Sequence, residues 1–191
     1  MILTEEIFQA TYEVRRLKKK ETVKSFDCGD TDLNDFILTE SHHYRKALLA
    51  VSYVAENKLD DYRVSAYFSL ANDKVSLNDF ESKTDFNRFR KHRFVNEKRL
   101  KSYPATKICR LGVDTSAKGL HIGSFLLDFI KSYFVINNKT GCRFLTVDAY
   151  ADAIPFYMKN GFIPLNDEDA DSDTRLLYFD LATIADDELD D

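Results

Sequence analysis

The chain has 191 residues, 44% of them apolar and 31% charged, and its formal net charge at pH 7 is −5. This length suits a single domain with a sizeable core, and the composition is ordinary for a soluble globular protein. No apolar run reaches the length that crosses a membrane, and the first residues lack the basic and apolar zones of a signal peptide. The sequence therefore favours a cytoplasmic protein without a membrane partner.

The cysteine content agrees with that location. Cys28, Cys109 and Cys142 are an odd number at wide spacing, and they show no pattern of metal ligands. Cytoplasmic proteins keep their thiols reduced, and free cysteines are among the most buried residues. We expect three reduced, mostly buried thiols and no metal site.

In the first half of the chain, the pattern predicts one helix followed by a hairpin. Turn-forming residues over 27–32 open a helix that runs toward Tyr44, with either Asp30 or Thr31 as its N-cap. Alternating apolar residues near 49–53 predict a strand, and a turn leads into a second strand over 63–70. These two strands are expected to pair with each other.

Residues 78–102 are interpreted as helix and loop, and they carry a basic run. Its members are Arg88, Arg90, Lys91, Arg93, Lys98, Arg99 and Lys101. Such a run is usually the solvated face of a helix. It can also form a positive lip for an anionic acceptor, in which case Arg90, Lys91 and Arg93 are candidates for binding it.

The second half alternates strands and helices. The predicted elements are a strand over 107–114, a helix over 122–136, a strand over 143–149, a short helix over 152–160 and a last strand over 176–181. Along the first of these strands, Ile108 lies on one face and Leu111 and Val113 on the other. Such alternation implies an α/β (α+β) fold in which helices cover both faces of a mixed sheet.

The C-terminus concentrates negative charge. Five of the last six residues, Asp186, Asp187, Glu188, Asp190 and Asp191, are acidic, so the rest of the chain is close to neutral. We expect a single domain over residues 1–185 and an acidic, flexible tail over 186–191.

Two motifs indicate the chemistry. Residues 110–114 read as an apolar strand, and 118–124 as a glycine-containing turn that opens a long helix. This junction aims backbone N–H groups and the positive end of the helix dipole at one point, where a diphosphate can bind. Many strand-turn-helix junctions bind nothing, so the weight comes from a second motif at 156–162, Phe-Tyr-Met-Lys-Asn-Gly-Phe.

Together the motifs resemble the Gcn5-related N-acetyltransferase (GNAT) superfamily. The resemblance implies a single domain with a splayed sheet of six or seven strands, and acetyl-coenzyme A as cosubstrate. The superfamily's loop pattern is Gln/Arg-x-x-Gly-x-Gly/Ala; here Lys118 takes the first place, His121 replaces the first glycine and Gly123 fills the last. Gly112 would let the cofactor approach the backbone. The residues that the resemblance assigns to the cofactor are Leu111, Gly112, Val113, Lys118, Gly119, Leu120, His121, Ile122, Gly123, Ser124, Ala153 and Phe156.

The same resemblance implies a catalytic acid. Tyr157 of the second motif would lie beside the cofactor sulfur and protonate the leaving thiolate, because a phenol stays protonated at neutral pH. The general base stays open: the chemically suitable side chains are Glu40, His42, His43, His121 and Asp148, and a water relay is an equal alternative. Arg110 would either structure the acceptor side or pair with an acidic residue.

The acceptor also stays open. The segment 26–36 is similar to the Asp-Cys-Gly-x-x-x-Leu-Asn-x-Phe-Leu opening of a GNAT subgroup that includes toxins of toxin–antitoxin pairs. That resemblance implies acetylation of the amino group of aminoacyl-tRNA and a small DNA-binding antitoxin as partner. The alternatives are another primary amine, from a small molecule or a protein, and a non-catalytic module that binds coenzyme A or a partner. A homodimer is a further possibility.

Overall fold

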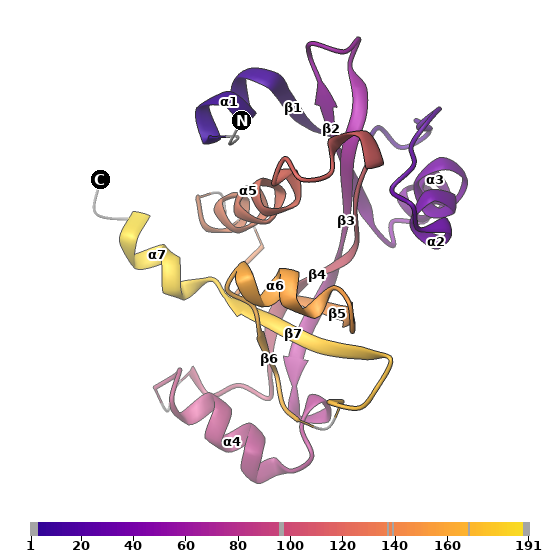
Figure 1. The fold of residues 1–191 in the computed structure, drawn as a ribbon. Coiled ribbons are helices and arrows are strands. Elements are labelled where there is room, and N and C mark those ends of the chain that lie inside the picture. Colours follow the sequence, from indigo (N-terminus) through magenta and orange to yellow (C-terminus); the bar gives the residue numbers. More distant parts are fainter. Residues whose placement is uncertain (1–3, 96–97, 137, 139, 168, 189–191) are drawn as a thin grey trace. The chain divides into compact units, whose positions relative to one another are not determined.

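The computed structural model describes residues 4–95, 98–136, 138, 140–167 and 169–188. Within these residues, seven strands follow the order β1-β2-β3-β4-β5-β7-β6 in one sheet, as the sequence predicted for a mixed sheet of six or seven strands (Figure 1). The strands are β1 Tyr12–Arg16, β2 Val51–Asn57, β3 Arg63–Ser76, β4 Ser102–Val113, β5 Phe144–Tyr150, β6 Ile163–Pro164 and β7 Thr174–Asp180. The α-helices are α1 Glu5–Thr11, α2 Thr31–Asp35, α3 Ser41–Lys46, α4 Lys83–Lys91, α5 Ile122–Ile136, α6 Ile154–Lys159 and α7 Ala182–Glu188. No helix in the described part of the chain is long and apolar enough to cross a membrane.

The chain divides into two compact units, each built from two separate segments. The first unit combines Met1–Ala71 with Ile108–Ile130, and the second combines Asn72–Lys107 with Lys131–Asp191. The boundaries fall inside β3, β4 and α5 rather than in loops. The single domain expected over residues 1–185 stays a prediction, and each unit is described by itself.

In the first unit, helices cover both faces of the β2–β3 hairpin (Figure 1). Tyr53 pairs in register with Phe68, and their rings stack at 4.9 Å, with Phe129 of α5 beside them. The next register pair, Val54 and Tyr67, points to the opposite face. There it joins a buried cluster with residues of α2 and of the π-helical turn η1 (Phe36–Glu40), which continues α2 into α3.

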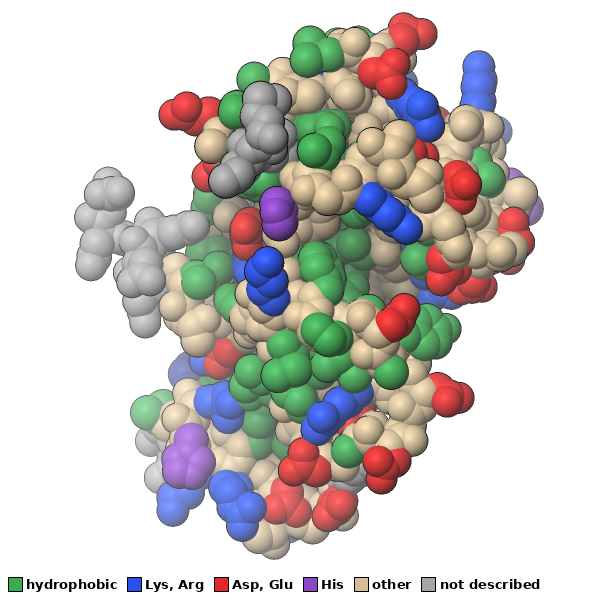
Figure 2. Space-filling model, viewed as in Figure 1, with side chains coloured by type: hydrophobic (Ala, Val, Ile, Leu, Met, Phe, Trp, Pro, Cys, Tyr) green, Lys and Arg blue, Asp and Glu red, His purple; other side chains and the backbone are tan. Residues whose placement is uncertain are grey.

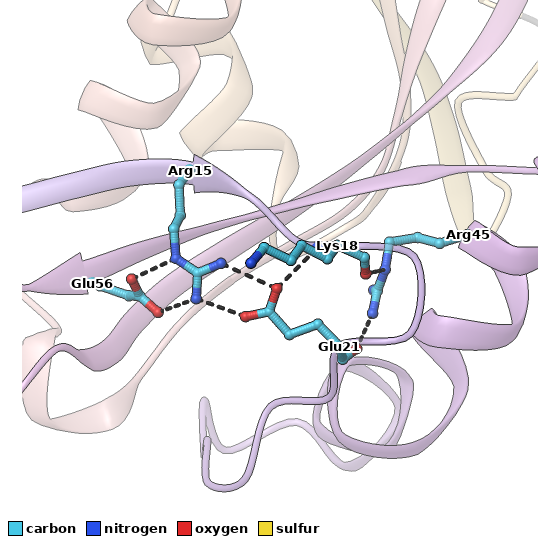
Figure 3. Close-up of polar contacts among 5 residues, drawn as sticks. All are labelled: Arg15, Lys18, Glu21, Arg45 and Glu56. Atoms are coloured by element: carbon cyan, nitrogen blue, oxygen red, sulfur yellow. Dashed lines mark hydrogen bonds and ion pairs between the residues drawn. The ribbon is translucent and has the colours of Figure 1, made fainter.

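A network of polar contacts holds the segment that follows β1 (Figure 3). Arg15 donates hydrogen bonds to both oxygens of Glu56, at 2.7 and 2.6 Å, and to both oxygens of Glu21, at 3.2 and 2.7 Å. The hydrogen bond from Arg15 keeps the pKa of Glu21 below its ordinary value. The buried Arg45 donates to the carbonyl oxygens of Lys18 and Glu21. These contacts fasten β1 and α3 to the chain that leads into residues 26–30.

In the second unit, the two faces of β5 and β7 carry different helices. Tyr178 and Phe144 face α4, where the ring of Phe89 lies 5.6 and 5.7 Å from theirs. Phe179 points to the other face and lies 5.7 Å from Phe162, which follows α6. β4 joins this unit through a short parallel pairing with β5, Ala105–Lys107 against Phe144–Thr146.

Several boundaries differ from those predicted. β3 continues six residues beyond the expected strand, to Ser76, and β4 begins at Ser102 and includes Pro104. A proline loses no ladder bond where its N–H position is unused, and the carbonyl of Pro104 still accepts from the Arg143 N–H at 2.9 Å. The sequence did not predict α1, β1, β6 or α7. Residues 186–188 of the expected tail belong to α7, and 189–191 lie outside the described residues.

The cysteines are placed as expected. Cys28 and Cys142 are buried and Cys109 is half-buried. Burial raises the pKa of the Cys28 and Cys142 thiols, which keeps both protonated at neutral pH.

Candidate active site

The glycine-containing turn begins where β4 ends. Asp114 is buried and caps the short 3₁₀ turn η4 (Thr115–Ala117) by accepting the Ser116 N–H at 3.0 Å and the Ser116 hydroxyl at 2.5 Å. Its carboxylate also accepts from the Asp27 N–H at 3.1 Å and from Arg63 at 3.3 Å. Burial alone would raise the pKa of Asp114, but the hydrogen bonds from Ser116 and the Asp27 N–H outweigh it and lower that pKa. The start of the turn is therefore fixed by an ionised carboxylate.

The backbone of the turn explains the histidine at the position of a glycine. Gly119 has φ +80° and His121 has φ +59°, so His121 adopts the left-handed conformation that glycine adopts freely. Its side chain is exposed, and its carbonyl accepts the N–H groups of Ser124 and Phe125 at 3.0 and 3.2 Å as α5 begins. The substitution thus leaves the glycine-like path of the chain in place. Histidine is among the non-glycine residues that tolerate this conformation best.

The first-turn N–H groups of α5 suit an anion. In any α-helix these donors lack an intrahelical acceptor, and the helix dipole adds partial positive charge. The exposed Lys118 lies in the turn before α5, and Ile122 and Gly123 are buried at the start of the helix. Leu120 is 37% exposed and Ser124 half-buried. Binding of a diphosphate by these residues stays a prediction.

Gly112 has a packing reason in addition to the one expected. A Cβ at this position would lie 2.9 Å from Cε1 of Tyr67 and 3.3 Å from Cζ of Phe26, both buried rings of the first unit. The missing side chain therefore makes room for these core aromatics. Leu111 and Val113, on the alternate positions, are half-buried. Backbone contact of these three residues with a cofactor stays a prediction.

Tyr157 lies in α6 and is 7% exposed. Its ring makes edge contacts with Phe156 at 5.2 Å and with Phe162 at 5.5 Å. Burial raises the pKa of Tyr157 well above its ordinary value, so the phenol stays protonated. Ala153 occupies the N-cap position of α6, and Gly161 ends the motif with φ +84°.

All four arginines in the basic run have structural partners. Arg88 pairs with Asp85 at 3.2 Å, and Arg99 donates to the carbonyl of Phe94 at 3.2 Å. Arg93 lies 4.2 Å over the Phe89 ring, donates to the Tyr178 hydroxyl and pairs with Asp180 at 3.7 Å. Arg90 donates to the carbonyls of Arg99 and Leu100 at 3.3 and 3.1 Å. Basic side chains remain exposed around α4, at the lower left of Figure 2, with acidic ones beside them. Arg88, Lys91 and Lys98 are exposed members of the run.

Arg110 is placed on the same face of β4 as Gly112. It lies 5.3 Å over the Phe36 ring, pairs with Asp32 at 3.6 Å and donates to the carbonyl of Cys109 at 2.9 Å. Its Nε is buried and has no hydrogen-bond partner among the described residues. The alternative of pairing with an acidic residue is therefore present, and a role of Arg110 on the acceptor side stays a prediction.

Among the candidate bases, Asp148 is the one in the same unit as Tyr157. It is exposed, forms an ion pair with Lys107, and lies on the face of β5 opposite α6. Thr146, two residues earlier on that face, donates to Asp73 at 2.5 Å. Sequence reasoning missed Lys107 and Asp73, because no local pattern links β3, β4 and β5.

The first unit has a left-handed turn and a helix start that suit a diphosphate, and the second unit carries a buried phenol on α6; each is a feature of transferases that take an acyl group from coenzyme A. The family comparison is more specific. Residues 89–179 match the family model of an acetyltransferase (GNAT) domain. The protein is accordingly an N-acetyltransferase, with acetyl-coenzyme A as cosubstrate.

Solved structures with the same fold extend beyond the matched residues. A Tyr-to-Phe mutant of KacT is 21% identical, with a TM-score of 0.73, and the match covers 92% of this chain and 98% of that one. AtaTR bound with acetyl-coenzyme A is 23% identical, with a TM-score of 0.71, and covers 92% and 96%. AtaT complexed with acetyl-methionyl-tRNAfMet is 22% identical, with a TM-score of 0.71, and covers 91% and 96%. No curated protein sequence matches the chain.

Proposed function

We propose that this cytoplasmic N-acetyltransferase acetylates the amino group of aminoacyl-tRNA. One observation carries the proposal: the fold match to AtaT, which has been solved with acetyl-methionyl-tRNAfMet, covers 91% of this chain. It therefore includes most of the first unit, which lies largely outside the GNAT match at residues 89–179. A likeness restricted to the acetyl-donor half would not favour any acceptor.

In this proposal the donor is held by the turn and by β4. Leu111, Gly112 and Val113 bind the pantetheine through their backbone, as an added strand would. The N–H groups of residues 119–123, the Ser124 hydroxyl and the ammonium of Lys118 bind the pyrophosphate. Ala153 and Phe156 contribute the contacts from α6. The left-handed backbone at Gly119 and His121 supports this assignment.

Tyr157 acts as the general acid. Acetyl-coenzyme A supplies the acetyl thioester, and transfer forms a C–N bond while the C–S bond breaks. The Tyr157 phenol donates its proton to the departing sulfur, and its raised pKa supports this role because the proton is present at every physiological pH. The amine of an aminoacyl ester is substantially neutral near pH 7, so its proton can leave to water without a dedicated base.

The basic run would bind the tRNA backbone. We assign the phosphate contacts to the exposed Lys91, with Arg88 and Lys98, because their charges are available to solvent. Arg90 and Arg93 shape the segment through their contacts with carbonyls, rings and Asp180. Arg110, whose side chain is 37% exposed, is assigned to the acceptor side.

The alternative of a non-catalytic module is not favoured by the structure. Its support was the histidine in the loop, and His121 keeps the left-handed backbone while its side chain is exposed. As partner, we propose a small antitoxin, since AtaT has been solved with the C-terminus of the antitoxin AtaR. A homodimer is included in the same proposal.

The test is an acetyl-transfer assay with radiolabelled acetyl-coenzyme A. Aminoacyl-tRNAs, uncharged tRNA, polyamines and peptides are offered separately, and label is measured in the acid-precipitable tRNA. We expect label with aminoacyl-tRNA alone, and its loss with Tyr157→Phe. Uncharged tRNA is the matched control because it has the same phosphates without the amine. Turnover only on a polyamine or peptide would refute the tRNA proposal while leaving the acetyltransferase assignment intact.

A further inference from the structure

The Asp-Cys-Gly turn at residues 27–29 has no part in the mechanism above, although it lies directly against the donor loop. The Thr115 N–H donates to the carbonyl of Asp27 at 2.8 Å. In return, the Asp27 N–H donates to the carboxylate of Asp114 at 3.1 Å. The two loops are thus joined by a reciprocal pair of hydrogen bonds, each anchored on the first residues after β4.

The Asp27 side chain stiffens its own side of this junction. Its Oδ1 accepts from the Gly29 N–H at 2.8 Å and from Nδ2 of Asn34 at 2.8 Å, which ties the turn to α2. These hydrogen bonds, from Gly29 first and Asn34 second, keep the pKa of Asp27 below its ordinary value. Asn34 in turn accepts the Cys28 N–H at 2.9 Å. The turn is therefore braced against a helix before it meets the donor loop.

Gly29 of this turn lies next to the side chain of Lys118. Its φ is +83°, and a Cβ there would lie 3.5 Å from Nζ of Lys118 and 3.8 Å from Cγ2 of Thr115. The ammonium of Lys118 therefore lies over the bare backbone of Gly29. Its charge is one of the smaller causes that lower the pKa of Asp27. A lysine on an exposed loop otherwise loses about 2 kcal/mol of rotamer entropy when it is fixed on a ligand.

From these contacts, and resting on the donor site proposed above, we infer that the Asp27–Gly29 turn is a positioning element for the pyrophosphate of acetyl-coenzyme A. It holds Thr115 and Lys118 in the bound geometry before the donor arrives. Asp27, Gly29 and Asn34 are positioning residues that act through Lys118 and through the backbone of the donor loop. Preorganisation of this kind raises affinity without any new contact to the ligand.

The experiment compares two donors in the full chain. Acetyl-coenzyme A carries the pyrophosphate, and S-acetyl-pantetheine lacks it. Dissociation constants are measured by calorimetry for the wild type and for Asp27→Ala, with KM and kcat for the donor. We expect Asp27→Ala to weaken acetyl-coenzyme A binding about tenfold, equal to about 1.4 kcal/mol, with KM raised and kcat at saturation unchanged. Binding of S-acetyl-pantetheine should not change.

Three further variants separate positioning from loss of fold. Asp30→Ala is the matched control, because Asp30 caps α2 through the Leu33 N–H at 3.0 Å in the same motif; it should lower Tm and leave donor affinity unchanged. Asp27→Asn keeps an oxygen acceptor and should restore most of the affinity. In the Lys118→Met background, Asp27→Ala should cost less than it does alone. If Asp27→Ala does not fold, Asn34→Ala is used in its place.

The outcomes are distinct. Equal losses for both donors, or no loss for acetyl-coenzyme A, would overturn the positioning role while the donor site stands. Full additivity with Lys118→Met would overturn the part assigned to Lys118. A wild type that binds neither donor would refute the proposed donor site itself, and the positioning role with it.

Discussion

Gly112 allows a quantitative prediction, because the cost of a single added carbon can be worked from the structure. In Gly112→Ala the new Cβ would lie 2.9 Å from the Tyr67 ring and 3.3 Å from that of Phe26. Tyr67 cannot swing away easily, since it is fully buried and its hydroxyl donates to the Leu33 carbonyl at 2.7 Å. Overpacking of this kind costs about 1–3 kcal/mol. The lower entropy of the unfolded alanine chain returns about 0.4–1 kcal/mol.

The net destabilisation should be about 1–2 kcal/mol, which lowers Tm by about 2–8 °C in a chain of this length. Thermal unfolding followed by circular dichroism measures it, and calorimetry with acetyl-coenzyme A measures the affinity of the folded variant. Because the clash is with Tyr67, the alanine should cost less in a Tyr67→Leu background. A variant as stable as the wild type, with weakened donor binding, would refute this reasoning and restore the interpretation of Gly112 as a site of close cofactor approach.

Three other perturbations test the site and the packing around it. Tyr157→Phe should fold normally and lose about a hundredfold in kcat. Because burial raises the pKa of Tyr157, wild-type kcat should not fall between pH 7 and 9. A decline of kcat in that range would argue against Tyr157 as the general acid. Glu21 has a lowered pKa in the folded state, so its stabilising contribution is present above its unfolded pKa and is lost as pH falls through the folded value. Urea unfolding between pH 6 and 3 should therefore show a shallower loss of stability for Glu21→Gln than for the wild type, and parallel curves would contradict this. Arg93→Met should lower the free energy of unfolding by about 1–3 kcal/mol, because it removes the contacts with Tyr178 and Asp180. Lys91→Met should change the free energy of unfolding by no more than about 0.5 kcal/mol and should instead raise KM for tRNA at low salt. A stability loss in Lys91→Met with a KM effect in Arg93→Met would contradict both assignments.

The sequence was most informative where one local pattern determines one element. The helix over 122–136 was predicted with the bounds that the structure shows, because nearly continuous apolar positions and a glycine turn define it. Asp30 was one of two candidates for the N-cap of α2, and its side chain does accept from Leu33. The strands predicted near 49–53 and over 63–70 pair as expected, because the turn between them brings the two segments together as antiparallel neighbours.

Contacts between distant segments were not predictable in the same way. The Asp-Cys-Gly turn was identified as a motif, but nothing in one sequence indicates that Asp27 meets Asp114, 87 residues later. The same holds for Gly112, whose requirement for glycine depends on two rings from other elements. The basic run looked uniform in the sequence, yet Arg93 is a packing residue and Lys91 is exposed, since only tertiary contacts distinguish them. The short β6 and the N-terminal α1 and β1 carry too little periodicity for a pattern to reveal them.

The division of the chain has a consequence for its synthesis. Each unit is made of two segments, and a segment of the other unit lies between them in the sequence. The chain passes from one unit to the other within β3, β4 and α5. When the ribosome has made residues 1–71, the segment that completes their unit is still to be translated, and the second unit must wait for the C-terminal strands. An N-terminal fragment cannot therefore acquire activity early. Each unit is therefore expected to complete its fold only after most of the polypeptide has been synthesised.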